Sequence, residues 1–250
     1  VKTNHLPRPG ETVLGGTFFM NPGGKGANQA VAVVRLGGQV SFICKTGSDI
    51  FGHQSQQLFE EEGIDTSYIF SDPKNPSGVA LITVDAHAEN CIVVEFVSKI
   101  ASKKNKRVIL NPAPAQTLSA TLLRHLYMIT PNETEAEMIS GVKITDEVSA
   151  KKAAQVIMEM GVQNVIVTLG SKGALIYCDS MVDMVPAIKV EAVDTTAAGD
   201  IFNGALTVAL AEGRDLREAV RFACKASAIS VTRVGAQSSV PYRNEVDIFD

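Results

Sequence analysis

The sequence predicts an α/β fold, a doubly wound and mainly parallel sheet flanked by helices, with a small β-sheet lid. First, short apolar runs typical of buried strands alternate with amphipathic helical patterns along the 250 residues. Second, polar or glycine-rich loops follow several of the strands, as in open α/β sheets. Third, β-prone segments near 4–22 and 77–94 interrupt the alternation of strands and helices. We therefore expect one domain over residues 1–250, with the lid built from these two segments.

The first half begins without the usual opening strand, because residues 1–10 are polar and contain two prolines. The elements expected after it are β-prone pieces at 11–20, a helix running from the glycine-rich stretch to Gly38, a buried strand at 40–46, a helix at 51–63, and a hairpin of strands 77–84 and 90–94.

The second half returns to alternating strands and helices. Its expected elements are strands at 108–110 and 127–130, a helix capped by Asn132, a helix at 150–160, strands at 165–169 and 174–178 joined by a tight turn, helices at 199–212 and 216–231, and a polar loop at 232–241. Asn111-Pro-Ala-Pro follows the strand at 108–110, and its prolines exclude a helix at that point.

Composition narrows the class of protein. The formal net charge is −4, which argues against a nucleic-acid binder. The four cysteines are far apart and lie among apolar residues, which is typical of free thiols in a reducing compartment. No apolar stretch reaches membrane-spanning length and no signal peptide is visible. We expect a cytoplasmic protein.

The stretch 21–38 contains Gly23, Gly24 and Gly26, which allow the backbone to approach a ligand. It is not a P-loop, since Gly-Ala follows Lys25 where Ser or Thr is required, and it does not match G-x-G-x-x-G. Lys25 and Asn28 are placed to bond the hydroxyls of a small polar ligand. The alternative is an ordinary turn into a helix.

The stretch 193–213, VDTTAAGDIFNGALTVALAEG, predicts an anion-binding helix start. Ala197, Ala198 and Gly199 leave the unpaired N–H groups of the first turn accessible to an anion. Asp200 then lies beside that anion, an arrangement that favours phosphoryl transfer with a carboxylate base. The alternative for Asp200 is a favourable interaction with the helix dipole.

Asn132 and Glu135 follow the strand at 127–130 and have the spacing of a capping box. The alternative to a purely capping role is functional: at the carboxyl end of a strand, they could organise the hydration shell of Mg²⁺.

Taken together, these stretches resemble the ribokinase-like (PfkB) family of carbohydrate kinases over nearly the whole chain. The resemblance rests on GGKGANQA (23–30), NPAPA (111–115), TPNETEAE (130–137), TLGSKG (168–173), AVDTTAAGDIFNGAL (192–206) and VTRVGAQSSVP (231–241). It implies an ATP-dependent, Mg²⁺-requiring and K⁺-stimulated kinase, and two of its motifs, GGKGAN and NPAPA, favour transfer to the terminal O5 hydroxyl of D-ribose. It also implies a homodimer formed through the lids.

The resemblance assigns roles to individual residues. Asp200 matches the catalytic base, and Ala197, Ala198 and Gly199 match the anion hole. Sugar contacts are implied for Gly24, Lys25, Gly26, Ala27, Asn28 and Asp200, and nucleotide contacts for Asn132, Thr168, Leu169, Gly170, Ser171, Lys172, Gly173, Gly199 and Cys224. A potassium site is implied at Asp194, Thr196, Ser230, Arg233, Gly235 and Ser239, largely through carbonyl oxygens, and a water-mediated Mg²⁺ contact at Glu135.

Two departures from the family pattern leave alternatives open. The opening strand is absent or reduced to residues 1–4, and there is no room between Val94 and Lys99 for the family segment that carries a sugar-contacting Glu. Glu95 is a candidate for that residue, without a safe match. A sibling kinase acting on deoxyribose, fructose or a nucleoside, and a non-catalytic sugar-binding relative, remain alternatives. A Rossmann oxidoreductase lacks its glycine fingerprint.

Overall fold

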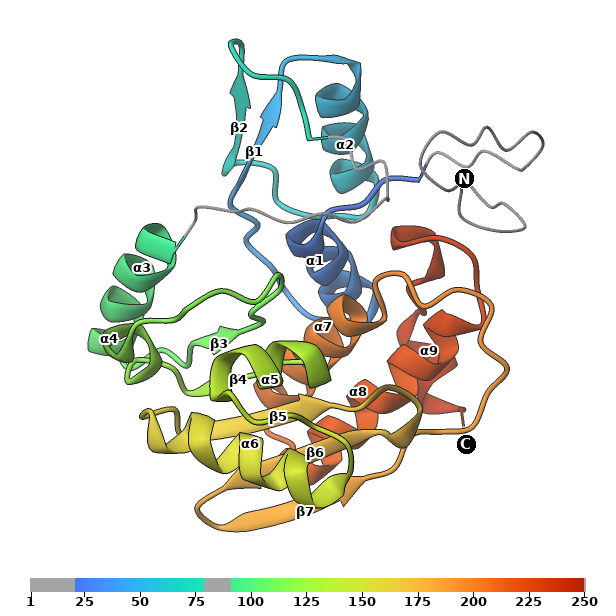
Figure 1. Cartoon of the computed structure of the whole chain (residues 1–250). Coiled ribbons are helices and arrows are strands. Elements are labelled where there is room, and N and C mark those ends of the chain that lie inside the picture. Colours follow the sequence, from blue (N-terminus) through green and yellow to red (C-terminus); the bar gives the residue numbers. More distant parts are fainter. Residues whose placement is uncertain (1–20, 79–90, 250) are drawn as a thin grey trace, which may run out of the picture.

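A computed structural model of the chain describes residues 21–78 and 91–249. It has a central sheet with helices on both faces, and a smaller unit that projects from one side of it (Figure 1). The predicted α/β class is therefore confirmed. None of the helices in these ranges is long and apolar enough to cross a membrane.

The described helices are α1 (Lys25–Arg35), α2 (Ile50–Glu61), α3 (Cys91–Lys103), α4 (Ala120–Leu123), α5 (Glu133–Ser140), α6 (Glu147–Glu159), α7 (Ala198–Ala211), α8 (Leu216–Val231) and α9 (Arg243–Asp247). The strands are β1 (Cys44–Gly47), β2 (Ile69–Asp72), β3 (Ile109–Leu110), β4 (Met128–Ile129), β5 (Asn164–Thr168), β6 (Ala174–Cys178) and β7 (Met181–Val185).

The central sheet has the order β3-β4-β5-β6-β7 and is mixed. Strands β3, β4 and β5 are parallel, whereas β6 and β7 form an antiparallel meander with β5. Along β5, Val165 and Val167 face the cluster that contains α4, α5 and α6, and Ile166 faces the cluster of α1, α7 and α8. A strand buried on both faces is apolar at every position, which explains the uninterrupted run VIV.

Strand β7 was not predicted. It pairs with β6 from Cys178↔Met181 to Ala174↔Val185, through the turn at Asp179 and Ser180. Four of the five residues of MVDMV are apolar, but no strand was predicted between the strand at 174–178 and the helix at 199–212. The other elements that were not predicted are the short β2, α4 and α9, and the 13-residue helix α3.

Two predicted strands are corrected. The segment 40–46 is not a buried strand: inward and outward residues alternate strictly, and Ile43 is 72% exposed. Residues 44–47 pair with β2, and Ser41 forms an isolated bridge with Asp65. This alternation is that of a strand with one covered face, and Phe42 packs edge-on against Phe59 of α2. The second strand of the predicted hairpin is also wrong, because residues from Cys91 onward belong to α3, where Val94 and Ser98 face inward with helical spacing.

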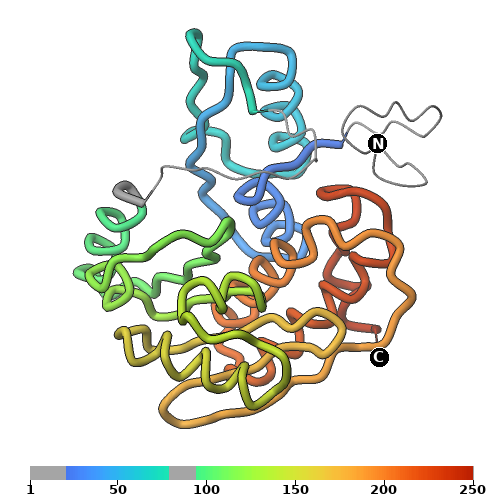
Figure 2. Tube along the Cα trace, viewed as in Figure 1, coloured from blue at the N-terminus to red at the C-terminus, as the bar shows by residue number. Residues whose placement is uncertain are grey.

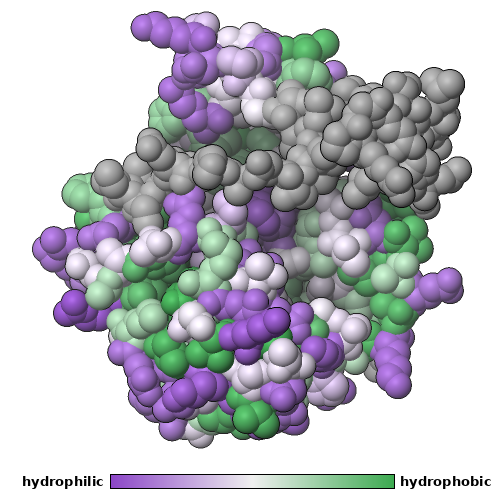
Figure 3. Space-filling view, in the orientation of Figure 1, coloured by the Kyte–Doolittle hydropathy of each residue, from purple (hydrophilic) through white to green (hydrophobic). Residues whose placement is uncertain are grey.

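The predicted lid lies mainly on residues outside the described ranges, including 4–20 and 79–90. Within those ranges, β1, β2 and α2 form a two-stranded parallel sheet with one helix, set apart from the central sheet (Figure 1). On the face of the molecule shown in Figure 3, hydrophilic and hydrophobic residues are interspersed over the main body.

Helices α1 and α7 pack closely, and this contact brings the two glycine-containing motifs together. A Cβ built on Gly204 of α7 would lie 2.6 Å from Cβ of Ala32 and 3.0 Å from the carbonyl oxygen of Gln29. Only glycine therefore fits at this crossing without a shift of α1. The N-termini of both helices are held side by side as a result.

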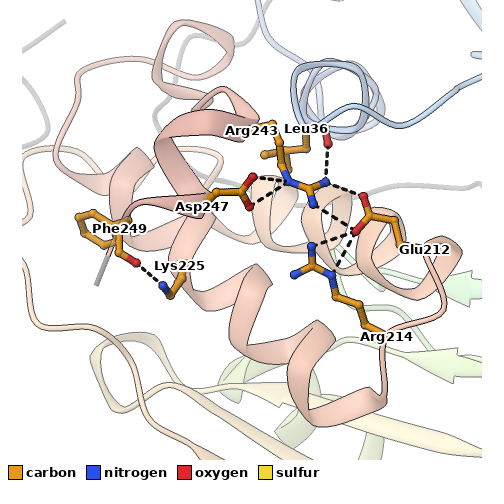
Figure 4. A network of polar contacts seen from close by, with 7 residues as sticks. All are labelled: Leu36, Glu212, Arg214, Lys225, Arg243, Asp247 and Phe249. Atoms are coloured by element: carbon orange, nitrogen blue, oxygen red, sulfur yellow. Dashed lines mark hydrogen bonds and ion pairs between the residues drawn. The ribbon is translucent and has the colours of Figure 1, made fainter.

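The C-terminal segment returns to α1 and is fixed there by arginines (Figure 2). Arg243 donates to the carbonyl oxygen of Leu36 at 3.2 Å and pairs with Glu212 and Asp247, and Glu212 also pairs with Arg214 (Figure 4). This network holds α9 against the C-terminal ends of α1 and α7.

Arg35, at the end of α1, makes a second set of contacts that is more buried than the Arg243 network. Its guanidinium pairs with Glu62 and donates to the carbonyl oxygens of Gln237 at 3.0 Å and Val240 at 2.9 Å; both side chains of the pair are 13% exposed. Arg35→Met leaves a nearly buried carboxylate without its partner, so we expect a loss of about 3 kcal/mol in the free energy of unfolding, measured by urea denaturation. The control is Arg217→Met, whose pair with Asp183 is exposed and contributes less than about 1 kcal/mol. Equal losses in the two variants would contradict the prediction.

Candidate active site

The start of α7 has the geometry of an anion-binding turn. Ala197, which precedes the helix, has left-handed φ 61°, and the described side chains provide no cap for the first turn. Gly199 is exposed, and a Cβ built on it would meet no atom within 4 Å. The Ala198 N–H donates to the carbonyl oxygen of Thr195 at 3.3 Å, whereas the exposed Gly199 leaves its N–H accessible to an anion, with the positive end of the helix dipole behind it.

Asp200 lies in the same turn and is only 4% exposed. Its Oδ2 accepts a hydrogen bond from Nδ2 of Asn28 at 2.8 Å, and its Oδ1 lies 3.8 Å from Nζ of Lys25. Burial raises the pKa of Asp200, while the Asn28 amide, the Lys25 charge and the Gln29 amide act in the opposite direction. The structure thus brings the predicted base together with two predicted sugar contacts.

Asn28 has an unused acceptor. The residue is 5% exposed, and its Oδ1 is buried with no hydrogen-bond partner among the described residues. A buried oxygen without a donor costs free energy unless a ligand supplies one. An incoming hydroxyl group can donate to Oδ1 of Asn28.

Gly24, Gly26 and Ala27 are the neighbours of Lys25 at the start of α1, and Gly24 precedes the helix with φ 104°.

Glu135 and Asn132 form the capping box that their spacing predicted. Asn132 Oδ1 accepts from the Glu135 N–H, and Glu135 Oε2 accepts from the Asn132 N–H, both at 2.8 Å. Glu135 is also buried, which raises its pKa; the Asp200 charge raises it further, and the Lys25 charge lowers it. Glu135 therefore belongs to the same electrostatic cluster as Asp200.

The loop predicted for the nucleotide, Thr168–Gly173, lies beside Asn132. Thr168 donates its N–H to the carbonyl oxygen of Pro131 at 2.9 Å, and Lys172 pairs with Glu133 at 3.1 Å. Gly170, Ser171 and Lys172 form a 3-10 turn that begins after Leu169. Gly173 has φ 107°, and a Cβ there would lie 2.0 Å from the carbonyl oxygen of Val185, so the loop packs tightly on the end of β7.

Cys224 lies in a separate depression rather than beside Asp200. It lines a cavity of about 620 Å³ together with Val185–Ile188 and residues of α8. Burial raises the pKa of its thiol to about 11, which favours the neutral thiol over the nucleophilic thiolate. One turn along α8, Ser227 donates to the carbonyl oxygen of Ala198 at 3.1 Å and so connects this cavity with the anion-binding turn.

Of the residues predicted for a potassium site, Asp194, Thr196 and Gly235 are in contact. Both carboxylate oxygens of Asp194 are engaged, one by the Thr196 N–H and the other by the Gly235 N–H, each at 2.9 Å. The hydroxyls of Ser230 and Ser239 donate to backbone carbonyls at 2.8 Å, which leaves their lone pairs available. The guanidinium of Arg233 pairs with Glu245, so only its backbone remains for a cation.

Glu95, the candidate for a sugar-contacting Glu, lies elsewhere. It is on α3, and its Oε2 accepts a 2.6 Å hydrogen bond from Ser119, the N-cap of α4. The sequence analysis also gave no role to Asn111, Thr130 and Asn203, three polar side chains that the structure places around the first turn of α7. The signal for Asn203 was its place in an otherwise apolar helix, IFNGALTVALA.

A buried carboxylate, an uncapped helix start and a second buried acid converge here, and such a constellation is suited to phosphoryl transfer. Comparisons with known proteins lead to the same class. Residues 1–96 and 90–243 match the family described as "pfkB family carbohydrate kinase". The chain belongs to the pfkB family of carbohydrate kinases.

Among its relatives is the ribokinase of Haemophilus influenzae, 41% identical over 98% of this chain and 92% of that protein. The deoxyribokinase of Salmonella typhi is 34% identical over 96% of this chain and 90% of its own length. Among solved structures, Arabidopsis thaliana ribokinase complexed with ribose and ATP superposes with a TM-score of 0.86 and 26% identity, over 97% of this chain and 91% of that one.

Proposed function

We propose that this chain is an ATP-dependent kinase that phosphorylates D-ribose at its terminal O5 hydroxyl. The observation that carries the proposal is the buried Asp200 carboxylate in the open first turn of α7, flanked by Asn28 and Lys25. The names of the Haemophilus and Arabidopsis relatives support ribose as the sugar.

In this mechanism Asp200 accepts the proton of the attacking sugar hydroxyl while its oxygen bonds to the terminal phosphorus of ATP. The bond between that phosphorus and the bridging oxygen breaks, and ADP leaves. Asn28 holds one carboxylate oxygen through its amide and offers Oδ1 to a sugar hydroxyl. The N–H groups of the turn at Ala197, Ala198 and Gly199 stabilise the charge on the transferring phosphoryl group. Lys25 adds positive charge beside Asp200, which acts to lower the pKa of the carboxyl and favours its ionised form.

The residues present fit both proposed cations. The described residues contain no group of three or more His, Cys, Asp or Glu able to chelate a metal. Glu135, oriented by Asn132, is a single carboxylate, and this suits a Mg²⁺ ion that keeps several waters and binds mainly to the substrate phosphates. The described residues also suit K⁺ held by carbonyl and hydroxyl oxygens around Asp194, Ser230 and Ser239. When bound, the cations supply neutralisation of phosphate charge and a fixed geometry of the anion-binding turn.

The proposal includes a homodimer formed through the lid, a cytoplasmic location, and the lack of a family segment between Val94 and Lys99. Support for this lack comes from the family match, whose two parts overlap at residues 90–96. The alignment with the Haemophilus protein also extends over 282 positions, more than the 250 residues of this chain.

The test is ATP consumption with D-ribose, 2-deoxyribose, fructose and a nucleoside, each with K⁺ or Na⁺. We expect ribose-dependent turnover that increases with K⁺. Turnover on deoxyribose instead of ribose would move the substrate to that of the Salmonella relative and retain the mechanism. Binding of ribose without turnover on any sugar would overturn the kinase proposal in favour of a sugar-binding protein.

The dependence of turnover on pH provides a further prediction. Because only the ionised carboxylate accepts a proton, kcat falls as the pH falls through the pKa of Asp200, which burial holds above its ordinary value. Lys25→Met removes a charge that lowers this pKa, so we expect the acid limb of the kcat profile to move to higher pH. The control is Lys151→Met, which loses only an exposed pair with Glu147. An acid limb that stays in place or moves to lower pH in Lys25→Met would contradict the assignment of Asp200.

A further inference from the structure

The reaction needs the anion-binding turn of α7 and the end of β4 at a fixed separation. The turn carries Asp200, and the end of β4 leads into Asn132 and Glu135. These segments belong to different layers, since α7 covers one face of the sheet and α5 lies over the other (Figure 1).

Two side chains connect these segments directly. Thr130, immediately after β4, donates its hydroxyl proton to Oδ1 of Asn203 at 2.6 Å. Asn203 in turn donates from Nδ2 to the carbonyl oxygen of Gly199 at 2.8 Å. Thr130 is 1% exposed and Asn203 is 4% exposed, so water does not compete for these bonds.

The orientation of the Asn203 amide follows from its partners. The carbonyl oxygen of Gly199 can only accept, so the atom facing it must be the amide nitrogen. Oδ1 then faces Thr130, whose hydroxyl can donate. Each of the two hydrogen bonds therefore has a fixed direction: Thr130 donates to Asn203, and Asn203 donates to Gly199.

A second series of hydrogen bonds also reaches Thr130. Asn111, after β3, donates from Nδ2 to the carbonyl oxygen of Thr130 at 3.2 Å, and its Oδ1 lies 3.5 Å from Nε2 of Gln29 on α1. Gln29 also contacts the Asp200 carboxyl through its amide. Polar side chains from α1, β3, β4 and α7 therefore surround the first turn of α7, with Thr130 bonded in both branches.

We propose that Thr130 and Asn203 are positioning residues for phosphoryl transfer, which fix the anion-binding turn and Asp200 relative to Asn132 and Glu135. The inference rests on the proposed kinase function and deepens it, because neither side chain contacts the reacting atoms. Small displacements of a reacting group lower the rate far more than they lower binding. Loss of the link should therefore act on kcat, with little effect on KM.

The experiment compares variants at Thr130 and Asn203 with a matched control on α7. Thr130→Val removes the hydroxyl at nearly constant volume, Thr130→Ser keeps it, and Asn203→Ala breaks the link from the other side. The control is Thr207→Val, because the hydroxyl of the exposed Thr207 donates to the Asn203 carbonyl oxygen of its own helix, at 2.8 Å, and bonds no other of the described residues.

We expect kcat to fall by about 10- to 100-fold in Thr130→Val and Asn203→Ala, with KM for ribose and ATP within about threefold of the parent. Thr130→Ser and Thr207→Val should stay within about twofold in kcat. The double variant should be no slower than the slower single variant, since both changes break one link. A kcat of Thr130→Val within twofold of the parent, or effects that multiply in the double variant, would overturn the inference.

Amide hydrogen exchange tests the same link without turnover. Thr130→Val should accelerate exchange at residues 201–203, whose N–H groups close the first turn of α7, whereas Thr207→Val should not. Unchanged exchange there would overturn the inference even if the parent phosphorylates ribose. A parent that does not phosphorylate any sugar would defeat the proposed function alone, and the exchange measurement would still decide on the link.

Discussion

Asp200→Asn should lower turnover by about 10²- to 10⁴-fold, the usual contribution of a general base. The substitution keeps the shape of the side chain and an oxygen that can accept the hydrogen bond from Asn28. It removes the group that takes the proton of the sugar hydroxyl. The measurement is kcat at saturating ribose and ATP, above the acid limb of the pH profile.

Two controls separate this loss from misfolding. The parent carries a buried carboxylate whose pKa is raised by burial, so the charge of Asp200 opposes folding at neutral pH. We therefore expect the melting temperature of Asp200→Asn to equal or exceed that of the parent. Asp146→Asn, at the exposed N-cap of α6, should leave turnover unchanged because Asn caps as well as Asp. Near-normal turnover in Asp200→Asn would refute its role as the base.

Much of the site could be predicted because its signals are local. An uncapped run of small residues before an apolar helical pattern predicts the start of α7 and places Asp200 in its first turn. The spacing of Asn132 and Glu135 likewise predicts a capping box, which the structure contains. In both cases the geometry depends on three or four consecutive residues.

The rest depends on contacts between distant segments. The bond from Thr130 to Asn203 joins positions 73 apart, and that from Gln29 to Asn111 joins positions 82 apart. No local pattern indicates such pairs. The corrected segments illustrate the same limit: CIVV is β-prone by composition, yet Val94 begins a series of inward positions that continues at Ser98 and Ala101 with helical spacing.

Glu135→Gln is the change that distinguishes the two roles of the capping box. Gln replaces Glu in a capping box, because its side-chain oxygen can also accept from the Asn132 N–H. The substitution therefore preserves the start of α5 and removes only the charge. If Glu135 orients the waters of Mg²⁺, we expect the Mg²⁺ concentration for half-maximal activity to rise about tenfold and kcat at limiting Mg²⁺ to fall about 10- to 100-fold.

The electrostatics of the cluster make this effect larger than that of an ordinary cap. Glu135 is buried within reach of the charges of both Asp200 and Lys25, so its own charge contributes to the field in which the phosphoryl group moves. Ser149→Ala removes the N3 side chain from the equivalent box of α6, with an expected loss of about 0.5–1.5 kcal/mol in stability and no change in Mg²⁺ dependence. An unchanged Mg²⁺ requirement in Glu135→Gln would reduce Glu135 to a capping residue and would leave Asn132 and the substrate phosphates to position the metal.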